Sequence, residues 1–291
     1  MTDVDKIREL LNLTGFPFQH HCADRLAKLP KLQVSAEVSF THPPTNGPVL
    51  GVHGAIDLLA ACPSINDDVL VFFVIECKKA NDKIKNWIFL PNKQQDPKWP
   101  MFFFSTQSAS EPMQLQVTRS ATFPSLGLAR SVDFDFCING IEANAALSTT
   151  NRDQSEKIYN PLKQVVHGTV AFESAFPKVV EGIEYLRHGQ YSTHLYIPVV
   201  ITTANLYTAD FPVDQLQQGE IQPGTLSLTG PRKWLTFEFP LPDYLSYGAE
   251  RDGGLVNIPR RTVFIVHDQS IDEFFTSALD VHTLKNVPVR E

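Results

Sequence analysis

The chain has 291 residues, of which 43% are hydrophobic and 20% are charged, and its formal net charge is −7. This composition is typical of a soluble globular protein and gives no overall attraction to nucleic acid. No apolar stretch approaches the roughly 18–20 residues that cross a bilayer, and the acidic, polar N-terminus lacks the pattern of a signal peptide. The four scattered cysteines include no CxxC pair, which argues against a disulfide framework or a structural zinc site and indicates a reducing cytoplasm.

The first third of the chain predicts two helices followed by three strands. Apolar residues at helical spacing predict helices over residues 3–13 and 16–29, the second opened by Pro17 and ended by Pro30. Strands are predicted from alternating or continuous apolar stretches at 32–42, 49–60 and 69–80. The short turns between these strands are typical of an antiparallel meander.

The rest of the chain predicts further elements of both kinds. Residues 81–150 are rich in proline, so we expect an elaboration of the core there. A helical pattern then follows Thr150 and continues to Gly189, with Pro161 expected to kink or divide the helix. Later elements are predicted as strands at 194–204, 234–239 and 262–266, and as a final helix opened by a capping box of Ser270 and Glu273.

The order of elements between residues 16 and 204 is helix, three strands, helix and strand. A meander followed by a crossover helix and a returning strand belongs to the mixed α/β class. We therefore expect a core over residues 1–204 with an insertion at about 81–150. Residues 205–291 are expected to form an α+β extension packed on this core, whether or not it belongs to the same domain.

Charged residues end two neighbouring apolar strands. VLVFFVIECKK ends on Glu76, Lys78 and Lys79, and Asp57 ends the apolar stretch before it. Side chains alternate along a strand, so Glu76 and Lys78 share a face, and a suitable register would bring Asp57 beside Glu76. Two clustered carboxylates repel each other, which indicates a cation such as Mg²⁺ between them. Lys78 could then orient the attacking water, act as a general base or stabilise the transition state of phosphodiester hydrolysis.

Together with the order of elements between residues 16 and 204, the segments GAID and VIECKK resemble the signature of the PD-(D/E)XK nuclease superfamily. The resemblance implies a restriction-endonuclease-like fold with an α-β-β-β-α-β core. It also implies that Asp57 and Glu76 are metal ligands, together with the backbone carbonyl of Cys77, and that Lys78 is the catalytic lysine. Ile56 stands where the name of the superfamily has a proline.

Accessory residues follow from the same resemblance. Many members carry a further acid on the first core helix, where this chain offers Gln19 or Asp24. Some members use a glutamine on the helix after the third strand, for which Gln164 or Gln154 is the candidate. Glu37, on the first predicted strand, could join the acidic cluster, although an outward-facing strand glutamate is the more ordinary role.

A local excess of lysine begins where the motif ends. Lys79, Lys83 and Lys85 could contact the phosphates of a nucleic acid beside the site, with a solvated loop as the competing interpretation. A second acid-x-lysine triplet, Asp96-Pro-Lys98, lies among prolines with no buried strand leading into it. We therefore assign the site to the first triplet.

These observations predict a Mg²⁺-dependent nuclease, with Mn²⁺ able to substitute, that cleaves DNA in preference to RNA as a cytoplasmic endonuclease. The resemblance also suggests a role in microbial defence against foreign DNA. Two rival hypotheses stay open: a nuclease-like fold that has lost cleavage and serves as a docking module, and a structural subunit of a larger complex. The chain has no P-loop, so energy-driven translocation requires a protein partner such as an ATPase or helicase, and a homo-oligomer is the other expected assembly.

Overall fold

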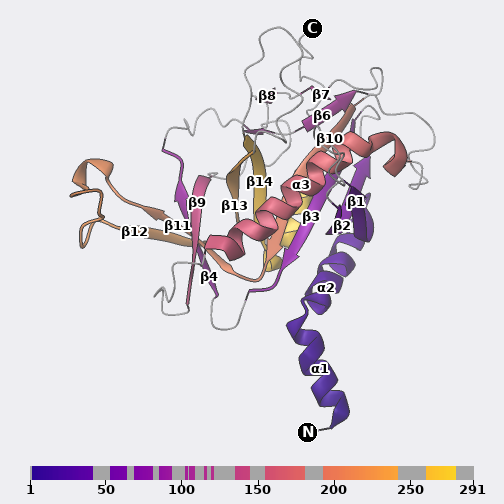
Figure 1. Ribbon diagram of the computed structural model, residues 1–291, viewed down its shortest axis with the longest axis horizontal. Coiled ribbons are helices and arrows are strands. Elements are labelled where there is room, and N and C mark those ends of the chain that lie inside the picture. The colour runs from indigo at the N-terminus through magenta and orange to yellow at the C-terminus, as the bar shows by residue number, and fades with distance from the viewer. Residues whose placement is uncertain are drawn as a thin grey trace.

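A mixed sheet with helices on both faces forms most of the part of the chain that the structure, a computed structural model, describes (Figure 1). The described residues are 2–41, 53–63, 69–80, 85–93, 102–103, 105–108, 115–116, 119–120, 135–144, 155–180, 193–241 and 260–279. Their helices are α1 (Asp3–Leu13), α2 (Phe16–Ala27), α3 (Ser155–Val180) and α4 (Ile271–Leu279), with single 3-10 turns at Val213–Gln215 and Asp268–Ser270.

The main sheet follows the order β1-β2-β3-β10-β14-β13-β9-β4-β11-β12, with β6 and β7 attached beside β10. Its long strands are β1 (Gln33–Thr41), β2 (His53–Pro63), β3 (Val69–Lys78), β4 (Asn86–Pro91), β9 (Phe136–Ala143), β10 (Thr193–Thr202), β11 (Asn205–Asp210), β12 (Ser227–Arg232), β13 (Trp234–Pro240) and β14 (Arg260–His267). The short strands are β5 (Phe102–Phe103), β6 (Ser105–Ser108), β7 (Leu115–Gln116) and β8 (Arg119–Ser120), of which β5 and β8 form a separate pair.

The predicted mixed α/β class is confirmed. The strands β1, β2 and β3 form the predicted antiparallel meander, and β10 returns parallel to β3. The order α2-β1-β2-β3-α3-β10 is the predicted order of elements, with β4 to β9 between β3 and α3. The strands β4 and β9, from the stretch predicted as an elaboration, lie inside the main sheet, between β13 and β11.

One detail of the helices differs from the prediction, and another part of it is not tested. Pro161 does not divide α3, which is continuous from Ser155 to Val180. Buried neighbours of Pro161, such as Ile158 and Leu162, pack on the sheet, and this packing holds the helix together where the proline removes a hydrogen bond. Residues 181–189, predicted as helix, lie outside the described residues.

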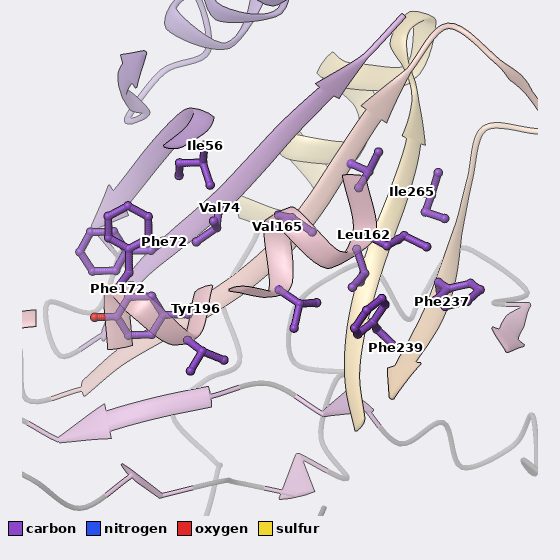
Figure 2. Close-up of a cluster of buried hydrophobic side chains, with 14 of the residues drawn as sticks. Ile56, Phe72, Val74, Leu162, Val165, Phe172, Tyr196, Phe237, Phe239 and Ile265 are labelled. Carbon is purple, nitrogen blue, oxygen red and sulfur yellow. The ribbon is translucent and has the colours of Figure 1, made fainter. Parts of the chain in front are cut away.

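The strands β3 and β10 are apolar on both faces because helices cover both faces of the sheet. On the α3 side, Phe72 and Val74 belong to the buried cluster that also contains Leu162 and Val165 of α3 (Figure 2). On the other side, Val71, Phe73 and Ile75 belong to the cluster that α2 and α4 complete; its helical members are Phe18, Cys22, Leu26, Ile271, Phe274 and Phe275. The site described below lies where β3 leaves this core.

Gly168 allows α3 to lie directly on β2. A Cβ atom at this position would come within 2.6 Å of Cγ2 of Ile56. This methyl is attached to the branched Cβ of Ile56, so it can move away only if the whole side chain rotates. Alanine favours a helix over glycine by about 1 kcal/mol, but we expect overpacking to outweigh this gain.

Gly168→Ala is therefore expected to destabilise the protein by about 1–3 kcal/mol in urea unfolding. Lys163→Ala, at an exposed position of the same helix, serves as the control and should change stability by less than about 0.5 kcal/mol. A more stable Gly168→Ala variant would show that α3 does not pack on β2 in this way.

Candidate functional site

Asp57 and Glu76 face each other where the pairing of β2 with β3 ends. The antiparallel register runs to Leu58 opposite Ile75, so the next step places Asp57 opposite Glu76. Glu76 is only 8% exposed, whereas Lys78, two residues further along the same face, is half-buried. The structure therefore brings together the three residues that the sequence predicts as the centre of the site.

Side-chain hydrogen bonds replace the strand ladder around Asp57. Its Oδ2 atom accepts a hydrogen bond of 2.7 Å from the backbone N–H of Cys77. Its carbonyl oxygen accepts one of 3.0 Å from Nε2 of Gln19 on α2, and its own N–H donates to the Glu76 carboxylate. These bonds satisfy the backbone of a residue that has left the ladder, and they hold its carboxylate toward β3.

At Asp57, the side chains of β2 change from one face of the sheet to the other. Ile56 packs in the cluster under α3, while Leu58, two residues later, packs in the cluster on the opposite side of the sheet. Residues two apart in a regular strand share a face, so the pleat reverses between them. Because of the reversal, the backbone of Asp57 does not follow the regular strand pairing. Its carbonyl oxygen can then bond to Gln19 and its carboxylate to the N–H of Cys77.

The neighbouring strand β1 shows the same reversal at Glu37. Ala36 pairs with Leu58 and Val38 pairs with Ile56, so Glu37 lies opposite Asp57 in register. Glu37 has a φ of 52°, in the left-handed region that residues other than glycine rarely adopt. The backbone conformation of Glu37 accompanies the change of faces in both strands.

The two carboxyl groups at the centre are unusually hard to ionise. Burial, followed by the nearby charge of Asp57, raises the pKa of Glu76 to about 8, while Lys78 acts in the opposite direction. Burial also raises the pKa of Asp57, and the charge of Glu37 adds to this effect; the Cys77 N–H and Lys78 oppose it. Additional positive charge beside the pair would therefore favour its ionised form.

The site residues fit a hard divalent cation. Oε2 of Glu76 is buried and accepts no hydrogen bond, although it lies beside a second carboxylate, that of Asp57. A divalent cation with a preference for oxygen ligands would satisfy this atom and neutralise both charges. Within the described ranges, no group of three or more His, Cys, Asp or Glu side chains could hold one ion. Two carboxylates suit Mg²⁺, which usually keeps several waters.

The side chain and the carbonyl of Cys77 have different surroundings. As predicted from strand alternation, the side chain turns away from Glu76 and packs in the cluster on the α2 side, where its thiol hydrogen-bonds with that of Cys22. Cys77 pairs in register with Ile201 of β10. Its backbone carbonyl, implied as a metal ligand by the resemblance, stays a prediction.

The accessory glutamines approach β2 from opposite faces of the sheet. Gln164 of α3 donates from Nε2 to the carbonyl oxygen of Ala55 at 2.9 Å, while Gln19 of α2 holds the carbonyl of Asp57. Both side chains therefore position the strand around the reversal through its backbone. Asp24, the alternative to Gln19, forms an ion pair with Lys28 on the surface of α2. Gln154, the alternative to Gln164, lies outside the described residues.

The predicted phosphate-binding lysines are only partly placed. Lys79 is exposed and donates from Nζ to the carbonyl oxygen of Asn12, near the end of α1. Lys85 is exposed beside β4, and Lys83 lies outside the described residues, as do Asp96 and Lys98 of the second triplet. Lys79 thus joins α1 to the end of β3.

The sequence interpretation missed Thr203, which follows β10. Its Oγ1 accepts a hydrogen bond of 2.8 Å from the N–H of Ala80, and its own N–H donates to the carbonyl oxygen of Lys78. Thr203 thereby anchors the chain on both sides of Lys79. No local signal marks this threonine, because its partners lie more than a hundred residues away along the chain.

Comparisons of the chain with protein-family models, with curated proteins and with solved structures return no match. Among the described helices, none is long and apolar enough to span a membrane. Fold and site together define a mixed α/β protein with two facing carboxylates and a lysine at the end of a buried strand.

Proposed function

We propose that this chain is a divalent-cation-dependent nuclease with a restriction-endonuclease-like core. The observation that carries the proposal is the pairing of Asp57 with Glu76, whose buried Oε2 accepts no hydrogen bond, with Lys78 on the same face. The order α2-β1-β2-β3-α3-β10, with β10 parallel to β3, supports the restriction-endonuclease-like assignment.

In this proposal Asp57 and Glu76 hold Mg²⁺ together with the backbone carbonyl of Cys77, and Mn²⁺ can substitute. When bound, the cation supplies the positive charge that polarises a phosphodiester and favours deprotonation of a water molecule. Lys78, whose charge already acts on both carboxyl groups, orients the attacking water or stabilises the negative charge of the transition state. Gln19 and Gln164 position the strand that carries Asp57.

The proposed substrate is DNA, cleaved internally. Because the net charge is −7, attraction to phosphate must be local, and Lys78, Lys79 and Lys85 are the described lysines nearest in sequence to the site. None of the four cysteines forms a disulfide, which is consistent with a reducing cytoplasm, where defence against foreign DNA is the proposed role. An ATPase, a helicase or a second copy of the chain is the proposed protein partner.

We expect the purified protein to cleave circular and linear DNA with Mg²⁺ or Mn²⁺ and to be inactive with EDTA. Parallel incubations with single-stranded DNA and with RNA test the preference for duplex DNA, and the circular substrate distinguishes internal cleavage from attack at ends. Cleavage that persists in EDTA, or no cleavage of any substrate with either cation, would contradict the proposal.

The second candidate is a nuclease-like fold that has lost cleavage and serves as a docking module. It is favoured by Gln19, which stands where an acid is expected and whose amide donates to the backbone carbonyl of Asp57. Calorimetric titration with Mg²⁺ and Mn²⁺ separates the two candidates, since a docking module has no need to bind either cation.

A further inference from the structure

Glu37 extends the carboxylate pair into a row of three. The register of β1 with β2 places Glu37 opposite Asp57, and that of β2 with β3 places Asp57 opposite Glu76. The three carboxylates thus come from three neighbouring strands at the same level of the sheet. The left-handed backbone of Glu37 is strained for an L residue, and such strain persists where the surrounding structure requires it.

The charge of Glu37 reaches the site. Its carboxylate contributes to the raised pKa of Asp57, so the two groups interact electrostatically. Glu37 itself is exposed, and it takes part in no ion pair with another residue of the described ranges. Among the described residues, Lys78 is the one positive charge that acts on both carboxyl groups of the central pair, Asp57 and Glu76.

An independent observation shows where a ligand would bind in this row. Glu76 is nine-tenths buried, and its Oε2 faces the neighbourhood of Asp57 without a hydrogen-bond donor. No group of three or more His, Cys, Asp or Glu side chains among the described residues could hold a single ion, so we do not count Glu37 as a direct ligand beside Asp57 and Glu76. Mg²⁺ keeps several waters, and an exposed carboxylate beyond the ligands can accept hydrogen bonds from them.

We infer that Glu37 is an outer ligand of the divalent cation, which it contacts through the cation's water, and that it makes nucleic-acid binding depend on the cation. This inference rests on the proposed function. Without the cation, the negative charges of Glu37 and Asp57 repel the phosphates of a nucleic acid. With the cation bound, most of this negative charge is neutralised, and phosphate can approach Lys78.

The first test is calorimetric titration of the full chain with MnCl₂. Glu37→Gln is expected to weaken Mn²⁺ binding on the order of ten-fold at low salt, because one carboxylate a few ångströms from a divalent ion is removed. The control is Glu220→Gln, which makes the same change of charge at an exposed position between β11 and β12, at the far end of the strand order from β1. This variant should bind Mn²⁺ as the parent does.

The second test measures binding of a fluorescent DNA duplex in EDTA and in Ca²⁺. In EDTA, Glu37→Gln should bind the duplex several-fold more tightly than the parent, because the repulsion is smaller. In Ca²⁺ the difference between variant and parent should decrease, since the cation neutralises the row. Thermal unfolding of each variant confirms that the fold is retained, as expected for exposed positions.

The outcomes separate this inference from the proposed function. If the parent protein binds no Mn²⁺, the proposed metal site is wrong, and the role of Glu37 is overturned with it. If the parent binds Mn²⁺ and Glu37→Gln binds it equally well, only the role of Glu37 is overturned. A loss of Mn²⁺ affinity of the same size in Glu220→Gln would reduce the effect to overall charge and would also overturn the inference.

Discussion

Lys78→Ala is expected to reduce DNA cleavage by about three orders of magnitude while leaving the fold and cation binding intact. Lys78 is half-buried on the face of Glu76, and its charge lowers the pKa of both Glu76 and Asp57. No other positive group among the described residues acts on both carboxyl groups. The measurement is the single-turnover rate of cleavage at saturating Mg²⁺, with Mn²⁺ titration and circular dichroism as checks on the site and the fold.

The matched control for this variant is Lys79→Ala. Lys79 is the next residue, so its removal changes the net charge equally, but its ammonium donates to the carbonyl oxygen of Asn12 outside the carboxylate pair. Lys79→Ala should therefore retain cleavage within about ten-fold of the parent rate, because only phosphate attraction is affected. Equal losses in the two variants would show that Lys78 acts through general charge and takes no part in the chemistry.

Glu76→Gln is expected to weaken Mg²⁺ and Mn²⁺ binding by more than about a hundred-fold and to abolish cleavage with it. The amide has nearly the same shape as the carboxyl group, so packing at this buried position is preserved while one anionic ligand is lost. Calorimetric titration measures the affinity, and Glu220→Gln again controls for overall charge. Unchanged Mn²⁺ affinity in Glu76→Gln would remove the central ligand from the proposed site.

The same variant tests the pKa of Glu76 in the metal-free protein. Below its ordinary value of 4.5 the group is protonated in both the folded and the unfolded states. Between 4.5 and about 8 only the folded state keeps the proton, so the free energy of unfolding falls as the pH rises; above about 8 it levels off. The slope approaches about 1.4 kcal/mol per pH unit.

Urea unfolding in EDTA across this pH range measures the decrease directly. Glu76→Gln has no proton to lose, so its stability should depend less on pH, and it should exceed that of the parent above about pH 8. Asp57, with its raised pKa, contributes a decrease of the same sign that remains in the variant. Parallel pH curves for the parent and the variant would contradict the raised pKa of Glu76.

Local sequence patterns predict most of the elements that carry the site. The apolar run of β3 predicted a strand buried on both faces, because only such a strand can be apolar at every position without exposing a face to water. The alternation of side chains placed Glu76 and Lys78 on one face and Cys77 on the other. These are local properties, set by chain geometry within a few residues.

The contact between Asp57 and Glu76 depends on the packing of the whole sheet. Strand pairing can slip by one residue, and a slip would turn Asp57 to the other face; the observed register depends on the packing of Leu58, Ile75 and their neighbours. The reversal of side-chain faces at Asp57 and Glu37 also arises from the tertiary structure, because no residue type in either strand predicts it.

The contacts that support the site are likewise non-local. Gln19 and Gln164 bond to β2 from two helices that lie far from it along the chain, and Thr203 holds the end of β3 from beyond β10. The strands β4 and β9 lie in the main sheet, where their apolar side chains are buried, although many prolines surround them in the sequence. Residue types and their spacing determine each strand and which side chains share a face. The carboxylate pair depends on the strand register and on distant hydrogen bonds, which form only when the whole sheet packs.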